Sequence, residues 1–340
     1  MRRKACGAFP RALLALVPAF AAFLAAAGFE PLVRAQERPS EVHVLPVQGN
    51  VYVLTGDGGN ITLQVGDDGV LLVNSGQVAL TEKVLAAIRT VSDKPIHYLI
   101  NTDDDEDNVG GNESIAKVGR TIAGGNVVGN IGESAGSTAT VIAYQTVLDR
   151  MSAAAGKGTA APEGAWPTDT YTLDHKDLFF NGEGIRVFHQ PAAHSDGDSM
   201  VFFRRSDVIS VGDIFLTTGY PVIDLQKGGS IQGVVDGLNH LMRLAIPGAV
   251  QGGPTDERGT MLIPGHGRIC DEGDLAFYQE MITIIRDRVQ DMIKKGMTPE
   301  QVKAARPTID YDPRYGKDAG PWTTDMFVEA VYRSLSEKKH

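Results

Sequence analysis

The chain has 340 residues and is acidic, with 42 Asp and Glu against 32 Lys and Arg and a formal net charge of −10. An acidic surface repels phosphate backbones and anionic headgroups, so the charge argues against nucleic acid and anionic membranes as partners. Only two cysteines are present, and Cys6 precedes an apolar run near the N-terminus. Once that segment is removed, Cys270 has no partner for an internal disulfide, so it is expected to be buried and inert, with a thiolate ligand as the alternative.

The first 35 residues have the pattern of a cleaved secretory signal. A basic start precedes the apolar run from Leu13 to Ala27, and Val33 and Ala35 offer small side chains at the positions that a signal peptidase inspects. A membrane anchor is the alternative, but the run is short for a span and Pro18 interrupts it. We therefore expect export to the periplasm or the extracellular space, cleavage after Ala35 and no stable membrane insertion. The remaining chain would carry a net charge of about −14.

The next hundred residues predict an antiparallel meander followed by layered α/β structure. Short β-branched runs are separated by turns rich in Gly, Asn and Asp, which is typical of hairpins. A helical pattern begins at Thr81, and a short helix is expected at 113–118. The expected strands of this half are 42–45, 51–55, 61–65, 70–73 and 96–100.

The second half repeats this content. Residues 138–155 are expected to be helical, and the Ala-, Gly- and Pro-rich tract 153–167 is expected to be a surface loop. A helix over 231–244 follows the strands, and a last strand is expected at 261–263. The strands expected before that helix are 170–173, 178–180, 185–189, 200–203 and 208–211. Two such halves predict a four-layered sandwich, with the sheets at the centre and the helices outside.

The C-terminal part is predicted to be helical. One apolar stripe runs from Leu275 to Met292, Thr298 begins a capping box with Pro299 at the first helical position, and a last helix covers 324–335. We divide the chain into a signal at 1–35, one αββα domain at 36–272 and a helical extension at 273–340 that packs on the same domain.

Five consecutive carboxylates, Asp103 to Asp107, follow the strand that ends at Ile100. Each close pair repels by about 1 kcal/mol even in water, so solvent, protonation or a cation must relieve the charge. A solvated acidic loop is the simplest alternative. An EF-hand does not fit, because Asn108 stands where the turn requires Gly and Ser114 stands where a bidentate Glu belongs.

Three further polar groups also lie just past apolar strands. His194 follows one strand, Asp213 ends another, and His266 follows a third. A sheet could bring all three to the same edge as the acidic run. Either histidine alone would more often be structural, but the ordered set favours a metal site.

These fragments, in this order and spacing, resemble the metallo-β-lactamase superfamily of hydrolases. The resemblance rests on Val51–Leu54 with Gly59-Asn60, Asp68–Val73, Asn101-Thr102 through Val109–Asn112, His194 with Gly197-Asp198, Gly212-Asp213 and Gly265–Gly267. It implies an α/β fold of the four-layer αββα type, a small-molecule substrate and one or two divalent metal ions. It leaves the oligomeric state open.

The central signature of this family, HxHxDH, is altered in this chain. It reads Asp103-Asp104-Asp105-Glu106-Asp107-Asn108, so carboxylates replace both histidines of the first metal and Asn108 replaces the last histidine. The resemblance implies that the metal ligands are Asp103, Asp105 and His194 for the first ion and Asp107, Asp213 and His266 for the second, with Asp213 in a position to bridge and Asn108 at most a weak oxygen donor.

The change of ligands has chemical consequences. Imidazole-rich sites suit zinc, which the family implies, whereas carboxylates favour harder ions such as manganese, iron, magnesium or calcium. Anionic ligands also donate more charge to the metal, which makes a bound water less acidic. We expect a weaker nucleophile at neutral pH, or a degenerate site without catalysis.

The leading functional hypothesis is an exported hydrolase that attacks an ester, thioester, lactone or amide carbonyl with a metal-bound hydroxide. Asp107 would orient the water or accept its proton. Tyr220, Asp224 and Ser230 could line the substrate pocket near a helix start, although Ser230 could equally be an ordinary helix cap. A non-catalytic metal- or ligand-binding protein is the main alternative. A redox or oxygen-handling di-iron site ranks below both.

Overall fold

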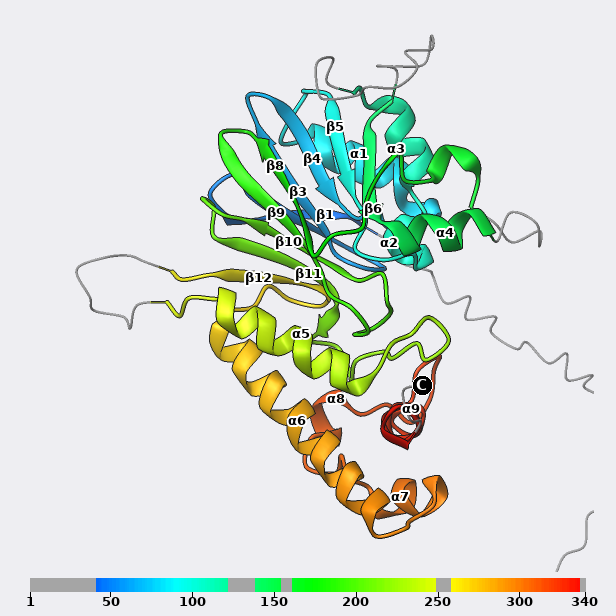
Figure 1. Cartoon of the computed structure of the whole chain (residues 1–340). Coiled ribbons are helices and arrows are strands. Elements are labelled where there is room, and N and C mark those ends of the chain that lie inside the picture. Colours follow the sequence, from blue (N-terminus) through cyan, green and yellow to red (C-terminus); the bar gives the residue numbers. More distant parts are fainter. Residues whose placement is uncertain (1–40, 122–137, 154–160, 249–257, 337–340) are drawn as a thin grey trace, which may run out of the picture. The chain divides into compact units, whose positions relative to one another are not determined.

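Two β-sheets form the framework of the computed structural model, which describes residues 41–121, 138–153, 161–248 and 258–336 (Figure 1). All of these residues belong to one unit, Ser40–His340. The predicted signal at 1–35 lies outside the described residues. Within the described part, none of the helices combines the length and the apolar character that crossing a bilayer requires.

The first sheet begins as an antiparallel meander and continues with parallel strands. The meander confirms the hairpins predicted from the turn residues, and parallel pairing begins where β5 joins β4. The strand order is β1 (His43–Gln48), β2 (Val51–Thr55), β3 (Ile61–Gly66), β4 (Gly69–Val73), β5 (Ile96–Ile100), β6 (Thr140–Tyr144) and β7 (Asp169–Tyr171).

The second sheet is antiparallel except for one parallel pair, which β11 and β12 form. Its order is β12 (Met261–His266), β11 (Val208–Leu216), β10 (Ser199–Phe203), β9 (Glu183–His189) and β8 (His175–Phe180). The α-helices are α1 (Thr81–Arg89), α2 (Glu106–Val109), α3 (Asn112–Val118), α4 (Gln145–Ala153), α5 (Ile231–Leu244), α6 (Glu272–Lys294), α7 (Pro299–Ala305), α8 (Asp312–Tyr315) and α9 (Thr324–Ser336).

The sheets pack face to face, and helices cover their outer faces. Leu71 of β4 shares a buried cluster with Val187 of β9, whereas its neighbour Leu72 packs with Val84 of α1. On the second sheet, Ile209 of β11 packs with residues of α5 and α6. Because successive side chains of a strand point to opposite faces, each sheet fills two apolar layers at once. The predicted four-layer αββα sandwich is confirmed.

One sequence-based prediction was wrong. The stretch 138–155 was expected to be helical, but Thr140–Tyr144 forms β6 and the helix begins only at Gln145. β6 lies between β5 and β7 and pairs with both in parallel. A short apolar run does not reveal by its periodicity whether it is strand or helix, so the neighbouring strands decide its structure.

The C-terminal helices share the core of the second half. Ile282 of α6, Phe327 of α9 and Leu238 of α5 belong to one buried cluster. The predicted capping box at the start of α7 is confirmed, because Thr298 and Gln301 each accept a hydrogen bond from the other's backbone N–H. The extension is therefore held by apolar packing onto α5 and β11.

Asn60 connects the two halves beside the end of β12. Its side-chain amide donates to the carbonyls of Pro264 and Gly267 at 2.8 and 2.9 Å, and its backbone N–H donates to Gly265 at 2.7 Å. These bonds fix the turn that carries His266. Asn60 is the asparagine of the Gly59-Asn60 fragment on which the family resemblance rested.

We expect Asn60→Ala to lower the free energy of unfolding by about 2 kcal/mol, because two carbonyls lose a buried donor. It should also weaken metal binding, since His266 is no longer fixed. Asn50→Ala is the matched control, because Asn50 also holds a carbonyl, that of Val65, but not on this turn. Urea unfolding and metal titration check both effects, and equal metal affinities in the two variants would contradict the role assigned to Asn60.

Candidate metal centre

Four segments of the chain meet at one edge of the sandwich. Asp105 and Asp107 follow β5, His194 lies between β9 and β10, and Asp213 and His266 lie toward the ends of β11 and β12. The carboxyl end of β5 and those of the parallel pair β11 and β12 converge here. The structure thus brings five of the predicted site residues together, although they span more than 160 positions of the chain.

The direction of Asp213 depends on the glycine before it. The pairing of β11 with β12 is irregular on both sides of Gly212, and Gly212 has φ of +56°. A Cβ atom there would lie 2.8 Å from Cβ of Thr102. Only glycine accepts both this backbone conformation and this approach without strain. The irregularity re-aims the next side chain, Asp213, toward the acidic loop.

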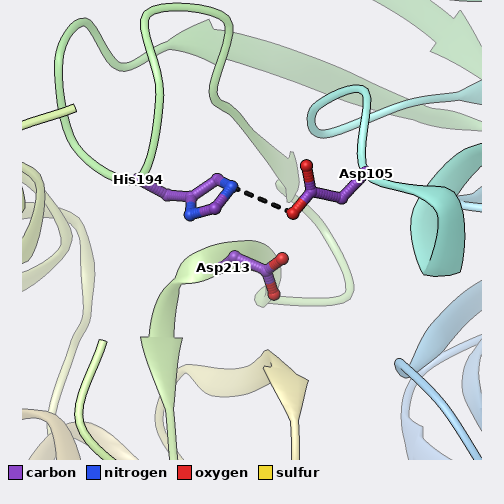
Figure 2. Close-up of side chains that lie close together, drawn as sticks. All are labelled: Asp105, His194 and Asp213. Carbon is purple, nitrogen blue, oxygen red and sulfur yellow. Dashed lines mark ion pairs between the residues drawn. The ribbon is translucent and has the colours of Figure 1, made fainter. Parts of the chain in front are cut away.

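The first ligand group contains Asp105, His194 and Asp213 (Figure 2). The Nε2 atom of His194 lies 3.2 Å from Oδ2 of Asp105, and each residue offers one ligand atom within 4.8 Å of the others. The Nδ1 atom of His194 donates to the carbonyl of Val222 at 3.1 Å. That bond fixes the ring so that Nε2 faces the two carboxylates, as in many metal-ligating histidines.

The second ligand group contains Asp107, Asp213 and His266. The Nε2 atom of His266 lies 3.0 Å from Oδ2 of Asp107 and 3.9 Å from Oδ1 of Asp213. Asp213 is common to both groups. The two groups therefore share one carboxylate, as a bridging ligand would require.

Two buried atoms of the centre, Nε2 of His194 and Oδ1 of Asp213, have no hydrogen bond of ordinary geometry in the described structure. Their contacts are the ion pairs with Asp105 and His266 given by the distances above. Buried polar atoms nearly always form hydrogen bonds, and a bound ion is one of the usual reasons for an exception. Both atoms face the same cluster of carboxylates and imidazoles. The residues present therefore fit one or more divalent cations.

Asp103 and Asn108 do not join either ligand group. Instead, the amide nitrogen of Asn108 donates to both carboxylate oxygens of Asp103, at 2.8 and 2.9 Å, and to Oδ2 of Asp213 at 3.2 Å. The amide oxygen of Asn108 accepts from Asn74 at 2.8 Å. All of these side chains are buried. In the structure, Asn108 thus holds both Asp103 and Asp213 by hydrogen bonds. The resemblance implied instead that Asp103 binds metal.

Two cations that the sequence analysis missed neutralise part of the acidic run. The ammonium of Lys227 lies 2.5 Å from Asp105 and 3.3 Å from Asp104. The guanidinium of Arg150 pairs with Asp104 at 2.8 Å and with Asp196. Lys227 is 122 positions from Asp105 in the chain, so no local spacing connects them. The sequence indicated only that Lys227 lies between Asp224, a predicted pocket residue, and Gly228.

The cluster shifts the pKa of its members. Burial, together with the nearby charge of Asp103, raises the pKa of Asp213 to about 7. Burial opposes a charge on His194, yet Asp105 and Asp198 raise the pKa of its imidazole well above the usual value. The hydrogen bond that His266 donates to the carboxylate of Asp107 raises the pKa of His266. Without a metal, bound protons balance part of the negative charge of the carboxylates. A divalent cation would otherwise neutralise that charge.

The three residues proposed to line a pocket have other contacts in the structure. Tyr220 is buried, stacks on Phe327 and donates its hydroxyl hydrogen to Asp312 at 3.0 Å. Asp224 accepts backbone N–H groups of its own turn. Ser230 caps α5 by accepting from the backbone of Gly233, which is the alternative that the sequence left open.

Cys270 is also outside the centre. It is buried, and burial raises the pKa of its thiol to about 12. Cys270 belongs to neither ligand group among the described residues. Its expected inert, buried state agrees with this placement.

Comparison with known proteins identifies the family. A family model described as the metallo-beta-lactamase superfamily matches residues 46–266. The chain belongs to this superfamily. The matched residues include both ligand groups, and proteins of this superfamily commonly hold divalent metals in such groups.

Individual relatives of this superfamily member are distant. The linear primary-alkylsulfatase of Pseudomonas sp. (strain ATCC 19151) is 25% identical over 261 residues, which cover 69% of this chain and 47% of that protein. The chain thus spans about half the length of this curated relative.

Two solved structures share the fold at low identity. The metallo-beta-lactamase from Pontibacter korlensis has 13% identity and a TM-score of 0.53, with 72% of this chain and 99% of that chain covered. The stereoselective inverting sec-alkylsulfatase Pisa1 from Pseudomonas sp. has 14% identity and a TM-score of 0.55, with 86% of this chain and 50% of that chain covered.

Proposed function

We propose that this protein is an exported, metal-dependent hydrolase that acts on a small ester, thioester, lactone or amide. The observation that carries the proposal is the convergence of three carboxylates and two imidazoles into two ligand groups that share Asp213. A divalent ion bound there supplies Lewis acidity, which polarises a substrate oxygen and makes water more acidic.

The chain's own residues have separate tasks in this proposal. Asp107 is about a quarter exposed and hydrogen-bonded to His266, so its carboxylate can orient a water molecule and accept its proton. Asp213 is buried and belongs to both ligand groups, so it would hold the cation from the protein side. Asn108 holds Asp213 by its amide, which limits the freedom of the shared carboxylate.

The ligand set favours hard ions. The two groups contain three carboxylates and two imidazoles. Such a set should bind manganese or iron better than an all-histidine site would. The named relative is an alkylsulfatase, which adds sulfate esters to the substrates that should be tested.

The test begins with protein purified without chelator, whose metal content is measured before turnover is screened on esters, lactones, β-lactams and alkyl sulfates with added Mn²⁺ or Zn²⁺. We expect Asp107→Ala to lower turnover about 10²–10⁴-fold, the usual range for losing a general base. Asp236→Ala, on the exposed side of α5, is the control and should keep full activity.

A non-catalytic binding protein is the second candidate, because Lys227 already pairs with a ligand carboxylate. Bound metal without turnover on any substrate class would favour it over the hydrolase. Absence of metal from the purified protein and from protein titrated with Mn²⁺ or Zn²⁺ would contradict the hydrolase and any metal-binding form of the second candidate.

A further inference from the structure

We propose that Lys227 takes the place of one of the two cations, so that the chain binds a single divalent ion through Asp107, Asp213 and His266. This inference rests on the proposed function only in assuming that the centre binds metal. It concerns how many ions the chain holds and where the ion lies.

Both carboxylate oxygens of Asp105 are engaged. Its Oδ1 atom lies 2.5 Å from the ammonium of Lys227, and its Oδ2 atom lies 3.2 Å from Nε2 of His194. A metal in the first ligand group would have to compete with the ammonium for the same carboxylate. Lys227 therefore supplies positive charge at the position where that metal would bind.

The backbone of Lys227 is held in place by the turn that contains it. Its N–H donates to the side chain of Asp224 at 3.1 Å, and its carbonyl accepts from Asp196 at 2.9 Å. Asp224 in turn donates its own N–H to the carbonyl of His194 at 2.9 Å. The lysine and the histidine are thus fixed relative to each other, and the lysine side chain is only a quarter exposed.

The second ligand group has a different charge balance. Within the part of the chain that the structure describes, Asp107 and Asp213 both form their ion pairs with His266. Asp107 and His266 are each more than a quarter exposed, so an ion can reach them from solvent. Two carboxylates match the charge of a divalent ion without a competing ammonium.

Electrostatics then separates the two groups. A divalent ion on Asp105 would lie a few ångströms from the ammonium of Lys227, and two cations on one carboxylate repel each other. An ion in the second group shares no carboxylate with the lysine.

The experiment counts ions on the full-length protein. Each variant is stripped with EDTA, dialysed against excess Mn²⁺, and its metal is measured per chain by mass spectrometry. We expect one equivalent for the wild type and two for Lys227→Met. Arg150→Met is the matched control, because Arg150 pairs with Asp104 and Asp196 but not with Asp105, and it should stay at one.

A second pair of variants locates the ion without depending on Lys227→Met. Asp107→Asn should lose the single equivalent, whereas Asp105→Asn should keep it. Circular dichroism and thermal melts verify that each variant is folded. This pair remains informative if the Lys227 variant fails to fold.

The outcomes separate the inference from the proposed function. Two equivalents in the wild type, an unchanged single equivalent in folded Lys227→Met, or loss of the ion in Asp105→Asn with retention in Asp107→Asn would each overturn the inference while leaving a metal-binding protein. No bound ion in the wild type or in Lys227→Met would overturn the proposed function as well.

Discussion

Replacing Asp213 by asparagine will remove the bound metal and at the same time stabilise the metal-free protein. Asp213 belongs to both ligand groups, so its loss weakens either mode of binding. Without metal, the carboxylate of Asp213 is buried beside Asp103. Burial and the charge of Asp103 raise its pKa to about 7. A neutral amide of similar size removes that unfavourable charge.

We expect Asp213→Asn to lower metal affinity at least 100-fold, the upper end of what changes around a metal site cost, and turnover about 10³-fold. At about pH 8 the metal-free variant should gain roughly 2 kcal/mol in free energy of unfolding. Metal titration, kinetics and thermal melts of the stripped protein measure these effects.

Glu183→Gln is the matched control for this experiment. Glu183 is also a buried carboxylate, but neither it nor its partners Gln64 and Ser206 belong to a ligand group. This variant should keep its metal and should not gain stability, because Glu183 accepts backbone N–H groups that an amide satisfies less well. A stripped Asp213→Asn protein that melts below the wild type would count against a buried, uncompensated charge at position 213.

The metal-free protein will lose stability as the pH rises above 6.5. In this range the native state keeps protons on His194, His266 and, up to about pH 7, Asp213, whose pKa values are raised. The unfolded chain releases the same protons at lower pH. Because the native state binds more protons, the free energy of unfolding falls as the pH increases.

Other groups set the lower limit of this window. Burial lowers the pKa of His189 and of His240, so both act in the opposite direction below 6.5. Burial opposes ionisation of Asp105, but His194 and Lys227 lower its pKa overall. This shift affects the free energy of unfolding only in acid. The window from 6.5 upward is therefore governed by the metal centre.

Metal affinity should change with the opposite sign. An ion must displace the protons of its ligands, so its apparent affinity should increase by up to about tenfold per pH unit for each proton displaced. Melts with and without Mn²⁺ across this range measure both trends. The stabilisation by Mn²⁺ should grow with pH, and Asp213→Asn should flatten the curve of the stripped protein. A melting temperature that rises with pH in the stripped wild type would contradict the assignment.

The sequence by itself determined the framework of this protein. Short β-branched runs and turns rich in Gly, Asn and Asp placed β2 to β5, and the apolar periodicity placed α5 within its observed bounds. These patterns depend on local geometry alone, because the pleat of a strand and the pitch of a helix repeat over a few residues. The position of polar residues just past strand ends also pointed to His194, Asp213 and His266.

Only the tertiary structure decided which of these side chains meet. Asp103 was as good a ligand by spacing as Asp105, yet Asn108 and Thr102 hold it by hydrogen bonds, and Asp105 faces His194 instead. The strand β6 was likewise decided by its neighbours β5 and β7. The partners of Lys227 lie about 120 positions away in the chain, so its role became visible only when folding brought that turn to the acidic loop. Local periodicity fixes the elements, whereas the charge around an ion depends on side chains that only long-range packing assembles.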